Sequence, residues 1–309
     1  MSIVQQDAPK QVPAATIAKV QTPFYRFAAA YVESRIAVVA LVGLVVIVFI
    51  ALFAPWLSPQ DPYDLAVVSI MDGRIEPGGE MFSGQIALLG TDGAGRDMLS
   101  AIFYGLRISL GVGISSGIIA LFVGMTLGLA AAYFGGRIDT VIMRVVDLQL
   151  SFPAILIALI LVAVLGKGID KIIIALVVVQ WAYYARTIRA SALVERSKEY
   201  MEAANCLALP HARILFRHLL PNCLPPMIVV ATLETARAIA LEATLSFLGV
   251  GLPQTEPSLG LLISNGFEYM MSGKYWISMF PGIALLLTIM TINLVGDQLR
   301  DVLNPRLEK

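Results

Sequence analysis

The chain alternates between long apolar runs and short polar segments. The first run covers residues 36–56, and no Asp, Glu, Lys or Arg occurs between Ile108 and Phe134. A helix needs about 20 apolar residues to cross the hydrocarbon core of a bilayer, and each run approaches that length. The pattern therefore predicts an all-α integral membrane protein with six transmembrane helices, at residues 36–56, 108–134, 148–165, 169–186, 224–248 and 277–296.

The first run could instead be the apolar core of a signal peptide. It is too long for that role, and it begins only at Ile36, after a polar or amphipathic stretch. We therefore interpret it as a retained first span.

Composition supports a membrane protein. Of the 309 residues, 58% are hydrophobic and only 14% are charged, whereas about a quarter of the residues in a soluble domain are charged. The formal net charge is zero, so the overall charge predicts no nucleic-acid partner.

Lysine and arginine are distributed unequally between the two sides. With both termini placed in the cytoplasm, the cytoplasmic segments hold fifteen of these residues and the outer segments hold six: Arg74, Arg96, Arg107, Lys167, Lys171 and Lys274. This positive-inside bias predicts cytoplasmic N- and C-termini. We divide the chain into two parts. Residues 1–100 hold the N-terminal tail, the first span and the outer loop, and residues 101–309 form the transmembrane domain with an inner loop at about 186–222.

Glycines in the second predicted span have the spacing that allows helix backbones to approach closely. The pairs Gly113/Gly117 and Gly124/Gly128 are each four residues apart. We expect them to support close packing within the bundle, although glycine is also generally frequent in membrane helices.

The inner loop is a basic, helix-forming segment between two spans. Residues 186–209 should continue the fourth span as a helix or restart as a short one, and Pro210 should end that helix. A second short helix could run from His211 to Leu220, until Pro221. Two such helices would make a compact knob that could dock onto a soluble subunit. The alternative is a solvated loop with local charge pairs.

The fifth span contains charged residues. Glu234 and Arg237 are three apart and share one helical face near the middle of the span. They could line a translocation path, as intramembrane charges often do, or form a structural pair that faces protein. Glu242 lies nearer the outer end, where we expect exposure.

Two kinds of site are not expected. Cys206, His211, His218 and Cys223 do not follow a zinc-ligand spacing, so we expect no metal. The stretch GTDGAGRD outside the membrane lacks the strand–helix context of a nucleotide-binding loop, so we expect a turn-rich structural segment there. The chain also has no Walker A pattern, which places any ATP hydrolysis on another polypeptide.

The segment EAANCLALPHARILFRHLLP, residues 202–221, resembles the EAA loop of permeases from binding-protein-dependent ABC importers. Glu202, Ala203 and Ala204 match the start of that motif, and Leu220 and Pro221 fall at the matching distance. The sequence departs from the motif at two positions.

Ala208 stands where the EAA motif usually has glycine, and His218 stands where it usually has isoleucine. The alanine leaves the geometry of the turn open.

Three further stretches resemble the dipeptide/oligopeptide branch of the same family, C-type subunit. They are residues 89–113, residues 242–260 and residues 296–307, the last with Asn304 in place of a usual Asp. The resemblance covers most of residues 24–309.

This resemblance implies a MetI-like type I ABC importer bundle in a bacterial inner membrane, without a cofactor of its own. It implies a second permease subunit, two cytoplasmic ATPase subunits that hydrolyse ATP, and an extracytoplasmic solute-binding protein. Glu202 would contact the ATPase, and Ala203 and Ala204 would permit close helix approach. Pro210 and Pro221 would fix the ends of the two short helices.

The implied cargo is small peptides. Nickel complexes, glutathione and opine-like or sugar-like solutes are alternatives within the family. Two other classes are disfavoured by the residues themselves. A self-sufficient ion-coupled transporter would need buried carboxylates in several spans, and a membrane enzyme would need clustered His, Asp or Glu at one depth.

Overall fold

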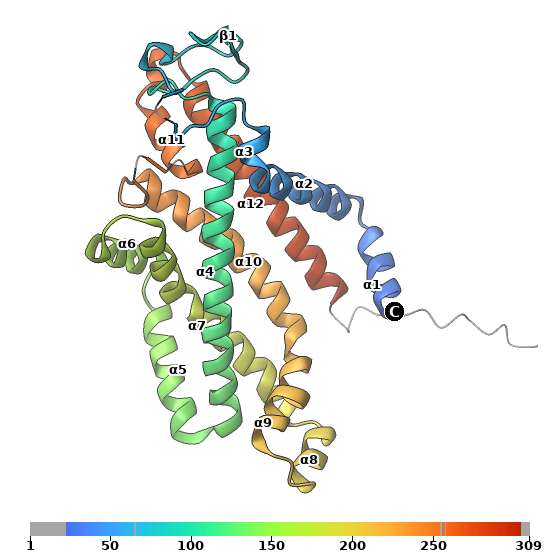
Figure 1. The fold of residues 1–309 in the computed structure, drawn as a ribbon. Coiled ribbons are helices and arrows are strands. Elements are labelled where there is room, and N and C mark those ends of the chain that lie inside the picture. Colours follow the sequence, from blue (N-terminus) through green and yellow to red (C-terminus); the bar gives the residue numbers. More distant parts are fainter. Residues whose placement is uncertain (1–22, 65, 254, 257, 304–309) are drawn as a thin grey trace, which may run out of the picture.

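The computed structural model describes residues 23–303, except 65, 254 and 257. Its helices lie along a long bundle, with the segment that follows α7 at one end and a loop-rich segment at the other (Figure 1). The helices are α1 (Pro23–Val32), α2 (Arg35–Leu52), α3 (Ala54–Leu57), α4 (Met98–Phe134), α5 (Gly136–Leu150), α6 (Ala154–Leu165), α7 (Ile169–Arg196), α8 (Glu199–Cys206), α9 (His211–Arg213), α10 (Leu220–Phe247), α11 (Leu259–Phe267) and α12 (Trp276–Val302).

Five of the six predicted spans are single helices in the described part of the chain. They are α2, α4, α7, α10 and α12, each long and apolar enough to cross a membrane. The α4 helix begins ten residues before the predicted span, because Asp97 caps its N-terminus by accepting a hydrogen bond from the Ser100 N–H at 2.8 Å. At 37 residues, α4 is about 55 Å long and therefore projects beyond a bilayer core.

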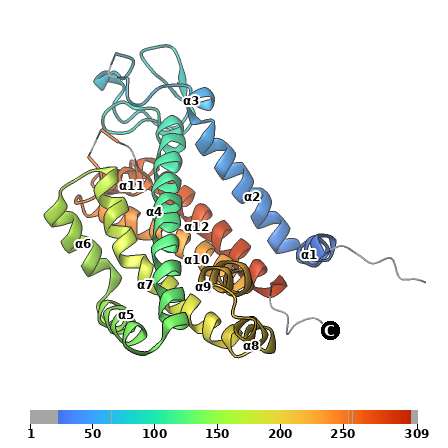
Figure 2. The ribbon, with the colours of Figure 1, turned by 60° about the horizontal axis from the view of Figure 1, so that its bottom comes forward.

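The prediction of a straight third span at 148–165 is wrong. Residues 148–150 belong to α5, and α5 and α6 meet at a 90° bend. Pro153 precedes α6 with an extended ψ of 128°, which no helix can continue through. With 12 residues, α6 is only about 18 Å long, so the two helices together form one broken segment (Figure 2).

The closest packing in the bundle joins α4 to α7. Gly124 lies against the backbone of Trp181 and Ala185, and Gly128 lies against Ala185 and Ile188. Gly113 faces Ile239 of α10 in the same way. The predicted role of these glycines in close packing is therefore confirmed.

Residues 58–97, which we name the cap, cover one end of the bundle. The cap holds a two-stranded antiparallel sheet, β1 (Gly79–Glu80) and β2 (Ile86–Ala87), and a 3₁₀ turn at Ile70–Asp72. Gly95 adopts φ +86°, and an added Cβ would collide with the Ser69 carbonyl, so only glycine fits.

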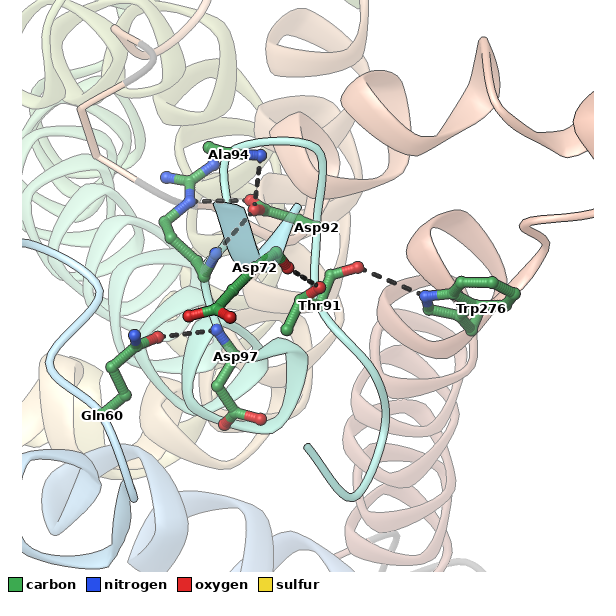
Figure 3. A network of polar contacts seen from close by, with 8 residues as sticks. Gln60, Asp72, Thr91, Asp92, Ala94, Asp97 and Trp276 are labelled. Atoms are coloured by element: carbon green, nitrogen blue, oxygen red, sulfur yellow. Dashed lines mark hydrogen bonds and ion pairs between the residues drawn. The ribbon is translucent and has the colours of Figure 1, made fainter. Parts of the chain in front are cut away.

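A buried polar network ties the cap to α4 and α12 (Figure 3). The Gln60 side-chain oxygen accepts a hydrogen bond from the Asp97 N–H at 2.7 Å, directly before α4. The Thr91 carbonyl accepts one from the Trp276 indole at 3.3 Å, at the start of α12. Asp92 binds the Arg96 guanidinium at 2.7 Å. The stretch GTDGAGRD is thus a turn-rich structural segment, as predicted.

Candidate functional site

Residues 197–219 connect α7 to α10 at the end of the bundle opposite the cap, and we name them the junction loop (Figure 1). The sequence left open whether the fourth span continues as a helix or a short helix restarts, and the structure has both. Helix α7 continues to Arg196, and α8 begins at Glu199. The α8 helix ends at Cys206, three residues earlier than expected, and Pro210 instead caps the next helical stretch.

The predicted end of the second short helix at Pro221 is wrong. Helix α9 passes into a π-helical stretch, Ile214–Leu219, and then directly into α10. Pro221 therefore lies inside a continuous helical run, near the start of α10. Proline has no N–H to donate within a helix, and the wider π-helical turn lies directly before Pro221, whereas Pro225 and Pro226 lie inside α10 itself.

Ala208 forms the turn between α8 and α9 in a left-handed backbone conformation, with φ +48°. Glycine adopts this conformation freely, whereas alanine is strained there by about 1–2 kcal/mol. The chain therefore makes a left-handed turn at the position where the motif it resembles has glycine.

Polar contacts that the sequence did not reveal hold the junction loop on the bundle. The Tyr200 hydroxyl of α8 donates to the Glu195 carboxylate of α7 at 2.8 Å and accepts from the Asn222 amide of α10 at 3.2 Å. Burial, together with the hydrogen bond to Glu195, raises the pKa of Tyr200 to about 12. The Tyr133 hydroxyl of α4 hydrogen-bonds to the ring of His211. The loop is thus fastened to three long helices.

The residues of the EAA motif divide into an outward and an inward set. Glu202 and Ala203 are exposed, as are Ala208, Pro210 and Pro221, and His218 and Leu220 are half-buried. Ala204 is buried in the core of this chain, together with Ile214, Leu219 and Cys223. The small side chain at position 204 therefore lets α8 lie against its own bundle, and Glu202 and Ala203 remain free to meet a partner.

Two large apolar side chains are exposed beside this outward set. Leu207, directly after α8, is 72% exposed and Phe216, in the π-helical stretch, is 63% exposed. Phe216 lies 31 residues before Phe247, the end of α10, which is about 46 Å along the continuous helical run and more than the roughly 30 Å of a hydrocarbon core. Hydropathy alone does not distinguish such residues from residues of a span.

The charged residues of α10 form a pair with unequal exposure. The Arg237 Nη1 lies 2.8 Å from the Glu234 Oε1, and the exposed fractions of the two side chains are 59% and 4%. The guanidinium also lies over the Tyr183 ring of α7, 5.4 Å from its centroid. The two residues therefore form an ion pair, as in one of the two alternatives expected from the sequence, but only the acidic member is buried in this chain.

The expectation that Glu242 is exposed is wrong. Its side chain is fully buried, and its two carboxylate oxygens accept hydrogen bonds from Ser109 of α4 at 2.9 Å and from Ser246 at 2.8 Å. Ser109 lies 133 positions away in sequence, so no local pattern indicated this contact.

The cysteines and histidines in and beside the junction loop do not come together as ligands. Cys206 is exposed and Cys223 is buried, and both are free thiols. Among the described residues, no group of three or more His, Cys, Asp or Glu side chains is arranged to hold a metal ion.

Residues 124–309, which contain the junction loop and α10, match the family model of the binding-protein-dependent transport system inner membrane component. The match covers more than half of the chain. The chain belongs to this family of permeases. A second model, the N-terminal TM domain of oligopeptide transport permease C, matches residues 22–72 of the permease.

Relatives align with nearly the whole permease. It is 41% identical to the dipeptide transport system permease protein DppC of Escherichia coli K12 over 93% of this chain and 95% of that protein. It is 37% identical to the di/tripeptide transport system permease protein DppC of Pseudomonas aeruginosa UCBPP-PA14, over 93% of each chain.

Solved structures support the fold. An inward-facing structure of the MetNI methionine ABC transporter aligns with a TM-score of 0.54 and 20% identity, covering 67% of the permease and 98% of that chain. The predicted MetI-like bundle is therefore confirmed, and the remaining third of the permease has no counterpart in that chain. Family membership also favours a transport subunit of the inner membrane over an ion-coupled transporter or a membrane enzyme.

Proposed function

We propose that the permease is the C-type subunit of an ATP-driven importer that carries small peptides across the inner membrane. The observation that carries this proposal is the alignment with dipeptide permeases over 93% of the chain, junction loop included. The partners would be a second permease subunit, two ATPase subunits and an extracytoplasmic binding protein.

In this proposal the junction loop faces the cytoplasm and docks onto an ATPase subunit. The positive-inside bias supports that orientation. The exposed Glu202 offers a polar contact, and Leu207 and Phe216 offer apolar anchors on neighbouring elements. Large apolar side chains exposed outside the membrane span are typical of a protein interface.

The contacts of the junction loop suit mechanical coupling. Since Tyr200 links α8 to both α7 and α10, a displacement of α8 by the ATPase moves those two helices with it. Closure of the ATPase pair on ATP would then favour one arrangement of the bundle, and release of the nucleotide would favour another. Binding protein and ATP must prefer different arrangements for this coupling to drive transport.

Charge reversal at Glu202 tests the docking proposal. In the complex reconstituted into liposomes, Glu202→Lys should lower peptide uptake and binding-protein-stimulated ATP hydrolysis by at least about tenfold, the loss expected when a contact worth about 1.4 kcal/mol is removed. Glu80→Lys is the matched control, because it reverses an equally exposed charge on the cap, at the other end of the bundle. Full transport by Glu202→Lys would refute the assignment.

The apolar anchors can be tested separately. Leu207→Ser and Phe216→Ser should each weaken retention of the ATPase subunits on the purified permease, by roughly 30-fold for an anchor of about 2 kcal/mol. Phe82→Ser is the matched control, because Phe82 is a large apolar side chain that is likewise exposed, on the cap. Unchanged retention in both junction-loop variants would contradict docking at this surface.

Cargo is tested by competition. Uptake of a labelled dipeptide by the complete system should be inhibited by unlabelled di- and tripeptides. If nickel complexes, glutathione or an opine-like or sugar-like solute is carried and peptides are not, the peptide assignment is wrong while the coupling proposal stands.

A further inference from the structure

Arg237 carries a charge at the centre of a membrane span. Ten residues separate it from Phe247 at the end of α10, which is about 15 Å at 1.5 Å per residue and half of the roughly 30 Å hydrocarbon core. At this depth, 59% of its side chain is nevertheless exposed.

Arg237 lies on the side of α10 that the neighbouring helices of this chain do not cover, which we call the open side. The helix packs against α4, α7, α11 and α12, which bury Glu234, Ala238 and Ile239. On the open side, Arg237 is followed by Ala240 and Thr244, whose hydroxyl is bonded back to the Ala240 carbonyl at 2.7 Å. On the open side the guanidinium is thus flanked by small side chains of α10, and Tyr183 of α7 lies against it.

A guanidinium is poorly tolerated among lipid tails at mid-membrane depth, so this side of α10 is expected to face water or protein. A water-filled path and the second permease subunit are the two environments that meet this requirement. The contacts around Arg237 favour the water-filled path, for the following reason.

Arg237 is held in place but is not saturated. An arginine has five N–H donors, and among the described residues its recorded hydrogen-bond acceptor is the Glu234 carboxylate alone. Tyr183 supports one face of the guanidinium plane. Glu234 is itself buried, and its carbonyl accepts a hydrogen bond from the Gln180 amide at 2.8 Å. Most donors of an oriented guanidinium therefore remain available to a group on the open side.

We propose that Arg237 binds the carboxylate group of the solute as it passes the middle of the membrane. The inference rests on the proposed function, in which the solute is a small peptide with a free carboxyl terminus. Guanidinium groups recognise carboxylates through paired hydrogen bonds. Glu234 competes with the solute for the same guanidinium, and this competition keeps binding weak enough for release.

The first test uses the complex assembled with its partners in liposomes. Arg237→Gln should lower dipeptide uptake at least about tenfold while assembly and binding-protein-stimulated ATP hydrolysis stay within about twofold of the wild type, and Arg237→Lys should restore part of the uptake. Arg144→Gln is the matched control, because it removes one exposed arginine from α5. Unchanged uptake by Arg237→Gln overturns the proposal.

The second test measures access to water. An Arg237→Cys variant is made in a chain that also carries Cys206→Ser, because Cys206 is exposed whereas Cys223 is buried. Water-soluble methanethiosulfonate reagents should modify the new thiol. A positively charged reagent should raise uptake again, and a negatively charged reagent should not.

The outcomes are distinguishable. A thiol that stays unreactive in the assembled complex, combined with loss of the second permease subunit from Arg237→Gln, places Arg237 in a subunit contact and overturns the proposal. Uptake by the wild type tests the proposed function separately. If the wild type does not carry peptides, the assignment of the cargo is wrong, but the reaction of the Arg237→Cys thiol with the methanethiosulfonate reagents still shows whether position 237 faces water.

Discussion

Replacing a glycine of α4 by alanine tests the packing of the bundle directly, because the same change can be made at a crowded and at an open position of one helix. At Gly124, an added methyl group would lie 2.6 Å from the Tyr184 Cβ and 2.9 Å from the Ala185 backbone nitrogen. At Gly111, an added methyl group would meet nothing within 4 Å. We predict that Gly124→Ala destabilises the permease and that Gly111→Ala does not.

The magnitude follows from these distances. Carbon atoms in contact normally lie about 3.5–4.0 Å apart, so α4 and α7 must separate by about 1 Å to admit the methyl group at Gly124. Such overpacking costs about 1–3 kcal/mol, and helices separated along their length lose further contacts. Alanine is favoured over glycine within a helix by about 1 kcal/mol, so Gly111→Ala should be neutral or slightly stabilising. Because both variants gain this helix preference, it cancels between them, and they should differ by the overpacking cost of about 1–3 kcal/mol.

The assay is thermal unfolding of the purified permease in detergent, followed by size-exclusion chromatography after heating. With an unfolding entropy of about 2.1 cal/mol/K per residue, a difference of about 1–3 kcal/mol corresponds to roughly 2–5 °C in the midpoint for a chain of 309 residues. Equal midpoints for Gly124→Ala and Gly111→Ala would show that α4 and α7 are not in the close contact described.

Variants at three other residues test individual contacts. Ala208→Gly should raise the thermal midpoint, since it relieves about 1 kcal/mol of left-handed strain in the junction loop, and a lowered midpoint would contradict the φ of +48°. Glu242→Ala should destabilise by about 2–4 kcal/mol because it leaves two buried serine hydroxyls without an acceptor, whereas Glu242→Gln, which keeps an oxygen acceptor, should be affected less; equal effects would contradict the described network. Burial and the hydrogen bond to Glu195 raise the pKa of Tyr200 to about 12, so its contribution to stability is present below pH 10 and is lost as pH rises toward 12. The difference in tyrosinate absorbance between the wild type and Tyr200→Phe should therefore titrate near pH 12. A midpoint near pH 10 would refute the contact with Glu195.

Most spans could be predicted from the sequence because hydropathy reports directly on membrane burial. The bend at Pro153 was missed because residues 148–165 carry no charged side chain, and a proline can either kink a span or break it. The extension of α4 to Met98 was missed because its first turns carry Ser100 and Arg107 and lie beyond the apolar run. In both cases hydropathy identifies the membrane segment and not the limits of the helix.

The junction loop was located by its motif, but its attachment was not predictable. Tyr200, Glu195 and Asn222 have ordinary spacings, and their contact depends on how α8 folds back between α7 and α10. The fate of Pro221 depends on the π-helical stretch before it, which has no signature in the sequence. The exposure of Arg237 and the burial of Glu242 are likewise set by neighbouring helices that are distant in the chain.

The cap network has a mechanical consequence for the transport cycle. Thr91 and Asp97 tie the cap to the start of α12 and of α4, so these two helices cannot separate at that end without breaking buried hydrogen bonds. The transport path is therefore not expected to open between α4 and α12 at the cap end of this subunit. In the importer proposed above, this would favour rotation of the permease as one body against a second permease subunit, with the gate at the seam between the two.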